Sequence, residues 1–163
     1  MEKKSPEQAL TRLVELYQGP LLRLCCVILR DAATAEDAVQ ETFLKAYRSL
    51  GGFRQEASEK TWLTAIALNV CRDMRKSAWW RTAQRSLPLD NLPLPAPAQD
   101  DSSLMLGQAI ARLPGKYRDA VLMYYYQDMT LAEAAQVLHT SPATLSKRLT
   151  RARDMLRREV TQG

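Results

Sequence analysis

The sequence is poor in the side chains from which catalytic and metal sites are usually built. It has one histidine, His139, and three cysteines in 163 residues. The cysteines, Cys25, Cys26 and Cys71, are odd in number and lack the spacing of metal ligands, so we expect reduced, buried thiols. No glycine-rich loop for cradling phosphates is present. We therefore expect no enzyme activity, no catalytic residues, no metal and no cofactor.

Long hydrophobic runs and strand-like alternation are also scarce. The most apolar early run, LLRLCCVIL, is short and is interrupted by Arg23, so it cannot span a membrane. No secretory signal is visible. The sequence thus predicts an all-α, cytoplasmic protein without direct membrane insertion.

Charge and proline divide the chain into parts. The net charge is +5, and residues 104–163 carry nine Lys or Arg against five Asp or Glu, which favours a polyanionic partner at that end. The segment from Ser86 to Ser103 has four prolines, three acids and no cation, which is typical of a linker. We expect two small helical domains, 1–82 and 104–163, joined by a flexible, proline-rich linker over 83–103.

The stretch from Thr130 to Arg158 predicts a helix-turn-helix. Thr130 and Glu133 are spaced as a capping box, and His139 stands at the turn, where tolerance of a left-handed conformation is useful. Ser141-Pro142 then begins a second helix, with proline at the first helical position. The inward face of that helix is predicted from its apolar spacing to be Leu145, Leu149, Ala152 and Leu156.

The other faces of this second helix carry short polar groups near its start and cations further along. A helix in the major groove needs short polar groups for base edges and cations for phosphates. The alternative is an ordinary amphipathic hairpin with a solvated basic face. Cap, turn and charge agree with each other, which favours DNA binding. The predicted contacts are Thr144, Ser146, Lys147, Arg148 and Arg151.

The N-terminal half predicts two long helices. Residues 6–30 form one helix, or two shorter ones broken near Gly19-Pro20. Thr34 with Asp37 predicts a capping box that opens a helix through about Leu50. An acidic and amide-bearing strip on that helix is either a solvated face or a protein-docking face for a basic groove. The strip consists of Asp37, Gln40, Glu41 and Leu44.

A third helix is predicted from about Thr61, in the sequence TWLTAIALNVCRDMRKSAWW. We expect Trp62, Ile66, Val70 and Met74 on its inward face. Its other side combines polar and cationic groups with nearby aromatics, as a single-stranded nucleic-acid surface does, although aromatics at helical spacing usually belong to a core. Periodicity alone leaves both interpretations open. The residues concerned are Asn69, Arg72, Arg75 and Lys76, followed by Trp79 and Trp80.

The chain closely resembles the bacterial extracytoplasmic-function RNA polymerase sigma factors of the sigma-70 family. Three stretches carry the resemblance: AEDAVQETFLKAYRSLGGFRQEAS, TWLTAIALNVCRDMRK and LPGKYRDAVLMYYYQDMTLAEAAQVLHTSPATLSKRLTRARDML. The resemblance covers about residues 8 to 160. It implies a region 2 helical bundle, a region 4 helix-turn-helix, and a function in directing promoter-specific transcription initiation under envelope or environmental stress. The alternative function is a stand-alone helix-turn-helix transcriptional regulator.

The resemblance implies a role for each of three sets of residues. Docking on core RNA polymerase is expected of Asp37, Gln40, Glu41, Phe43 and Leu44. Recognition of the minus-ten element as a melted strand is expected of Phe53, Arg54, Glu59, Lys60, Trp62, Asn69, Arg72, Arg75 and Lys76. Recognition of the minus-thirty-five element is expected of Ser141, Thr144, Ser146, Lys147, Arg148 and Arg151.

The resemblance also implies partners. These are promoter DNA, the clamp helices of the largest polymerase subunit, the flap of the second-largest subunit, and a cognate anti-sigma factor that could hold the chain near the membrane. Two departures from the family pattern bear on promoter choice. Glu59 stands where relatives commonly have an aromatic residue, and the recognition helix reads Ala143, Thr144, Leu145, Ser146, with Lys147 following.

Overall fold

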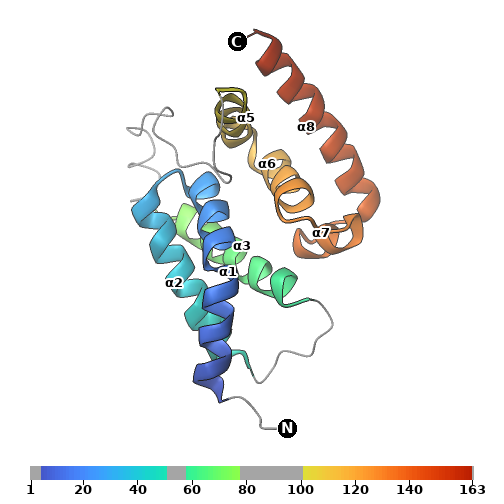
Figure 1. Cartoon of the computed structure of the whole chain (residues 1–163). Coiled ribbons are helices and arrows are strands. Elements are labelled where there is room, and N and C mark those ends of the chain that lie inside the picture. The colour runs from blue at the N-terminus through green and yellow to red at the C-terminus, as the bar shows by residue number, and fades with distance from the viewer. Residues whose placement is uncertain (1–4, 51–57, 78–100, 163) are drawn as a thin grey trace.

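The computed structural model describes residues 5–50, 58–77 and 101–162, and the side chains of 106–159 within the last range. Every regular element in these ranges is helical, as expected of an all-α chain. Helices α1 (Pro6–Leu29), α2 (Ala32–Arg48) and α3 (Glu59–Arg75) form one group. Helices α5 (Asp101–Arg112), α6 (Gly115–Val121), η3 (Leu122–Tyr126), α7 (Leu131–Val137) and α8 (Pro142–Gln162) form the other (Figure 1).

Helix α1 is a single helix that runs through Pro20. Ser5 caps its start through a capping box with Gln8, and Pro6 occupies the first turn, where a missing N–H costs nothing. Buried side chains follow Pro20 in close succession, from Leu21 to Leu29. Packing on α2 and α3 therefore holds the helix together across a residue that would otherwise break or kink it.

Helix α2 begins one turn earlier than the sequence predicts. Its N-cap is Asp31, whose carboxylate accepts a hydrogen bond from the backbone N–H of Thr34 at 2.9 Å. The predicted capping box of Thr34 with Asp37 is therefore wrong. Thr34 is buried inside the first turn instead, because a carboxylate three residues ahead was available as the cap.

Helix α3 begins at Glu59 with Ser58 as its N-cap, slightly ahead of the predicted start. Its fully buried face is formed by Thr61, Leu63, Thr64, Ala67, Leu68, Val70 and Cys71. Of the residues predicted to point inward, Val70 is fully buried, and Trp62, Ile66 and Met74 are half-buried and pack against the core. The most deeply buried side of the helix lies next to the predicted one, because α3 packs against both α1 and α2.

The second group ends in the predicted helix-turn-helix, which consists of α7 and α8 and lies on the right in Figure 1. Helix α5 starts at Asp101, so the last three residues of the predicted linker form its first turn, and the rest of 83–103 lies outside the described residues. Helix α6 continues into the π-helical segment η3, where the N–H of Gln127 donates to the carbonyl of Leu122. Buried apolar side chains of both groups form one continuous cluster.

Candidate nucleic-acid interface

The helix-turn-helix is defined by helix caps and a turn residue that can be recognised in the sequence. The N–H of Glu133 donates to the hydroxyl of Thr130, and the Glu133 carboxylate accepts in return from the N–H of Thr130, so the predicted capping box is confirmed. His139 adopts the left-handed conformation at the turn, with φ of 56°. Ser141 then accepts from the N–H of Thr144 and starts α8. Local hydrogen bonds thus start both helices of the motif.

Helix α8 separates an apolar face from a polar one. Leu145, Leu149 and Ala152 are buried, and Leu156 is half-buried, as their spacing predicts. Five of the six predicted minus-thirty-five contacts have exposed side chains, and Arg148 is half-buried. The exposed ones are Ser141, Thr144, Ser146, Lys147 and Arg151. This surface can present hydroxyl groups to base edges and cations to phosphates at the same time.

A second polar surface runs along α3. The side chains of Asn69 and Lys76 are exposed, and Arg72 is half-buried. The guanidinium of Arg75 is also half-buried, and burial together with nearby Arg118 lowers its pKa. Near the start of the helix, Glu59 forms an ion pair with Arg12 of α1, and Lys60 lies beside it half-buried. Glu59 thus makes a contact between α3 and α1.

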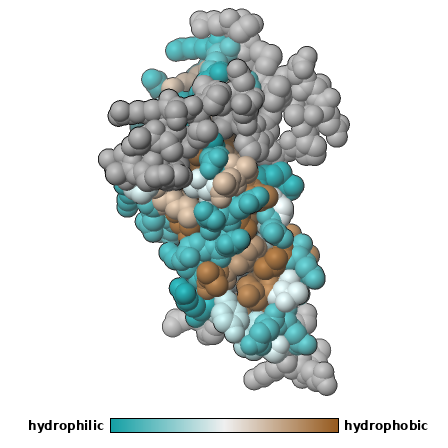
Figure 2. All heavy atoms as spheres, turned by 90° about the vertical axis from the view of Figure 1, so that its left-hand side faces the viewer, coloured by the Kyte–Doolittle hydropathy of each residue, from teal (hydrophilic) through white to brown (hydrophobic). Residues whose placement is uncertain are grey.

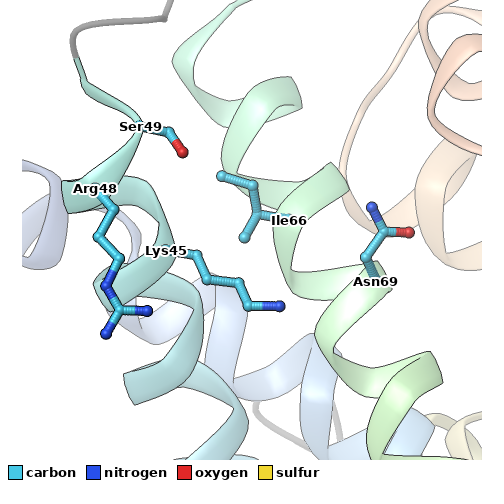
Figure 3. Close-up of a pocket in the computed structure, with 5 residues that line it drawn as sticks. All are labelled: Lys45, Arg48, Ser49, Ile66 and Asn69. Carbon is cyan, nitrogen blue, oxygen red and sulfur yellow. The ribbon is translucent and has the colours of Figure 1, made fainter.

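A pocket of about 280 Å³ lies between the end of α2 and the middle of α3. Its walls are Lys45 and Arg48 from α2, Ser49 directly after α2, and Ile66 and Asn69 from α3. Figure 3 shows Ile66 projecting from α3 toward α2, with the Lys45 side chain extending toward α3 from the other wall. The pocket therefore combines an apolar surface, an amide and two cations.

Sequence reasoning predicted only Asn69 of this pocket. Lys45 and Arg48 stand three apart in the last turn of α2, and Ile66 stands three before Asn69, so each pair shares one helix face. These spacings were visible in the sequence. That the two faces meet was not visible, because it depends on how α2 packs against α3.

The predicted docking strip lies on α2. Asp37, Gln40 and Leu44 are exposed, Leu44 to 49%, and Glu41 is half-buried. Phe43, which is also predicted to dock, is only 7% exposed and belongs to the core beneath the strip. Figure 2 shows the molecule from the side on which α2 lies in Figure 1, with hydrophobic groups exposed among hydrophilic ones. Such a mixed surface suits a protein partner.

Some predicted site residues cannot be placed. Phe53 and Arg54, together with Trp79 and Trp80, lie outside the described residues. Trp62, the remaining predicted minus-ten residue, is half-buried in the first turn of α3 and packs against the core.

The three cysteines are free thiols and all are buried, as predicted. Cys71 of α3 lies with its sulfur 3.5 Å from that of Cys25 of α1, and this hydrogen bond together with burial raises the pKa of Cys25 well above its ordinary value. Among the described residues, no three His, Cys, Asp or Glu side chains gather closely enough to hold a metal ion. Within those same ranges, no helix has both the length and the apolar character that a membrane crossing requires.

Comparison with known proteins matches both groups of helices. The family described as Sigma-70 region 2 matches residues 13–81, and the family described as Sigma-70, region 4 matches residues 103–156. The ECF RNA polymerase sigma factor SigW of Bacillus subtilis is 28% identical over 97% of this chain and 92% of its own length. SigM of Mycobacterium tuberculosis, an ECF RNA polymerase sigma factor, is 32% identical over 92% of this chain and 76% of its own length.

A longer relative aligns with this chain over part of its length. The probable RNA polymerase sigma factor RfaY of Xanthomonas campestris pv. campestris is 32% identical over 96% of this chain, and the chain spans 41% of the length of RfaY.

Two solved structures share the arrangement of helices. The sigma factor RpoE, in complex with the anti-sigma factor NepR from Bartonella quintana, is 26% identical, with a TM-score of 0.70 over 93% of this chain and 96% of its own. CnrH in complex with the cytosolic domain of CnrY has the same TM-score, and the match covers 96% of this chain and 90% of its own. At 23% identity it supports the fold alone. The chain belongs to the extracytoplasmic-function sigma factors of the sigma-70 family, which direct promoter-specific initiation by RNA polymerase.

Proposed function

We propose that this chain reads a promoter at two places while α2 holds it on core RNA polymerase. The observation that carries the proposal is the presence, on one chain, of two separate surfaces whose groups suit different forms of nucleic acid. The exposed face of α8 suits a duplex groove, whereas the pocket between α2 and α3 suits an unstacked base. A protein that binds duplex DNA alone has no use for the second surface. We assign the pocket to a domain of residues 1–82 and the α8 face to a domain of residues 104–163, with residues 83–103 as the linker between them.

The pocket would hold a base of the melted minus-ten strand. Ile66 offers an apolar surface for the face of the ring, and the Asn69 amide can both donate to and accept from a base edge. Lys45 and Arg48 lie on the opposite wall, where they can attract the flanking phosphates. Holding a base outside the stack costs a few kcal/mol, which these contacts must offset. Arg72, Arg75 and Lys76 extend the cationic surface along α3.

The face of α8 would enter the major groove at the minus-thirty-five element. Thr144 and Ser146 lie near the start of the helix with exposed side chains and can reach base edges. Lys147 and Arg151 are also exposed and can reach phosphates on either side. Arg148 is half-buried, and the exposed part of its side chain can also reach DNA.

The strip of Asp37, Gln40, Glu41 and Leu44 would dock on the clamp helices of the largest polymerase subunit. A leucine exposed among acids is complementary to a groove that is basic at its rim and apolar inside. Phe43 would support the strip from the core beneath it. The C-terminal domain would contact the flap of the second-largest subunit.

The relatives add a further partner. The solved RpoE structure is a complex with an anti-sigma factor, and the match between RpoE and this protein covers nearly the whole of both chains. We propose that a cognate anti-sigma factor likewise holds this chain inactive until stress releases it, in the cytoplasm or at the membrane. The protein itself acts as a binding subunit and not as an enzyme.

Transcription in vitro tests the proposal. Core RNA polymerase, this protein and fragmented host DNA should give discrete transcript starts, each preceded by the same pair of upstream motifs. The stand-alone regulator makes the opposite prediction, which is tight duplex binding without polymerase and a two-fold-symmetric footprint. No core binding and no specific starts would overturn the sigma assignment.

A further inference from the structure

Four guanidinium groups gather where the ends of α1 and α3 meet α5 and α6. Arg30 directly follows α1, and its guanidinium donates to the carbonyl of Ala111 in α5 at 2.8 Å. Arg72 and Arg75 lie in the last turn of α3, and Arg118 lies in α6. We call these four residues, Arg30, Arg72, Arg75 and Arg118, the arginine cluster. Its members come from both groups of helices, so tertiary packing alone brings them together.

The carboxylate of Asp119 in α6 lies against two members of this cluster. One oxygen of Asp119 accepts from two nitrogens of Arg118, at 3.1 and 3.2 Å. The other oxygen lies 4.0 Å from a guanidinium nitrogen of Arg72. One negative charge is thus shared between two cations, and it cannot neutralise both.

The remaining charges of the cluster act on one another. Burial lowers the pKa of Arg30, and the neighbouring cations Arg118 and Arg112 lower it further. Burial also lowers the pKa of Arg75, followed by Arg118, and Arg30 acts in the same direction against the opposite effect of Asp119. Arginine remains charged under all ordinary conditions, so the cluster holds repelling cations in a partly buried place. An anion bound among them would offset this repulsion.

Gly115, the first residue of α6, leaves space beside two of these guanidinium groups. A Cβ atom at Gly115 would lie 3.6 Å from a guanidinium nitrogen of Arg118 and 3.8 Å from one of Arg75. Apart from the adjoining residues and the backbone of α6, no other heavy atom of the described residues comes within 4 Å of that point. The absence of a side chain therefore lets an oxygen atom approach two guanidinium groups at once.

We propose that the arginine cluster is a binding site for a small phosphate-bearing anion, such as pyrophosphate or the phosphate chain of a nucleotide. Guanidinium groups carry paired N–H donors that match phosphate oxygens, and hydrogen bonds between charged groups are roughly twice as strong as neutral ones. A diphosphate has enough charge and enough oxygens to serve several arginines together. The carboxylate of Asp119 serves two of them with a single charge.

The same phosphate chemistry has a second source in a DNA strand. Burial favours the small anion, because Arg118 is only 4% exposed, and Arg30 and Arg75 are half-buried. A compact ion reaches such positions more readily than a polymer does. Under the proposed function, which gives Arg72 and Arg75 to the minus-ten strand, the anion and the strand would compete. The binding site itself does not depend on that function and can be measured on the protein alone.

The test is calorimetric titration of the full-length protein with pyrophosphate, in a buffer free of phosphate and divalent metal. We expect one saturable site per chain, with an affinity that falls as salt is added. Pyrophosphate should also raise the midpoint of thermal unfolding, because a ligand that binds only the folded chain stabilises it. A second arm titrates a 12-nucleotide single-stranded DNA, alone and in competition with pyrophosphate.

Two variants should change the affinity for pyrophosphate in opposite directions. Arg30→Gln removes one guanidinium and should weaken binding about 10- to 100-fold, the effect of a hydrogen bond to a charged group. Asp119→Asn removes the competing negative charge and should strengthen binding roughly three- to tenfold. A variant that merely damaged the fold would weaken binding, so the gain cannot come from misfolding. The matched control is Arg23→Gln, which removes an exposed cation of α1 and should leave the affinity unchanged.

The outcomes separate the site from its source. Absence of saturable binding would overturn the proposal, and so would equal affinity in Arg30→Gln and Arg23→Gln. A folded Asp119→Asn protein that binds no better than the wild type would overturn it too. If DNA displaces pyrophosphate and Arg30→Gln weakens both equally, the site takes phosphates of a strand, whereas DNA binding without displacement assigns it to the small anion. Failure of promoter-specific transcription would overturn the proposed function and leave these titrations valid.

Discussion

Two substitutions in the α2–α3 pocket should have different consequences if the pocket holds a base. Asn69→Ala removes the amide that can read a base edge, and Lys45→Ala removes a cation that can hold a phosphate. The amide is exposed, so its removal should change the free energy of unfolding by less than about 0.5 kcal/mol. Differences in DNA binding can therefore be attributed to lost contacts.

The magnitudes follow from the chemistry of each contact. Two hydrogen bonds to a base edge contribute about 1–3 kcal/mol of discrimination, so Asn69→Ala should reduce the preference for one base by roughly 5- to 150-fold. Lys45→Ala should weaken binding to every sequence by a similar factor. It should also lower the slope of log affinity against log salt by about 0.7, the value for one phosphate on a single strand.

The assay is binding of holoenzyme to fork-junction DNA whose non-template minus-ten strand is single-stranded. Each position of that strand is changed in turn to all four bases, at several salt concentrations. Gln18→Ala and Lys116→Ala serve as matched controls, since they remove an exposed amide and an exposed lysine elsewhere. If Asn69→Ala weakened binding to all bases equally, the amide would contact the backbone, and the base-pocket reasoning would be refuted.

Three further predictions concern docking, packing and pH. Leu44→Ala should leave the fold intact and weaken core polymerase binding about three- to tenfold, because half of a leucine side chain remains to be buried in the complex; equal affinity in a pull-down titration would remove Leu44 from the interface. Leu149→Ala should lower the free energy of unfolding in urea by about 2–5 kcal/mol, whereas Arg151→Ala should leave it nearly unchanged. Burial, with Glu36 and Asp31 nearby, raises the pKa of Cys26 from 9.0 to about 11, so stability should be full below pH 9 and should fall between pH 9 and 11. Cys26→Ala should reduce that alkaline loss, and thermal unfolding across this range measures it.

The sequence predicts those parts of the fold that local signals determine. The helix-turn-helix is defined by short-range signals, each of which has its predicted role. Thr130 and Glu133 form the capping box, His139 takes the left-handed conformation at the turn, and Ser141 caps α8. Local signals fail where two candidates compete. Asp31 and Thr34 are both good N-caps one turn apart, and only packing decides which one starts α2.

The candidate site was harder to predict than the fold. Asn69 could be identified on α3, but the other wall of its pocket comes from Lys45 and Arg48 on the preceding helix, α2. Ile66 was predicted to face the core, and it both packs against the core and lines this pocket. A helix with apolar residues on two sides does not reveal which side its neighbours will cover, because that depends on tertiary contacts.

Under the proposed function, helix α2 would link polymerase docking to base reading. The proposed docking strip, with Asp37, Gln40 and Leu44 exposed, lies on one face, and Lys45 and Arg48 line the pocket from an adjacent face. A helix is rigid over these three turns and its inner side is fixed by the buried core, so seating the proposed strip on polymerase would also set the position of the pocket wall. Substitutions in the strip should therefore change affinity for polymerase without changing base preference. Those in the pocket should do the reverse, even though Leu44 and Lys45 are consecutive in the chain.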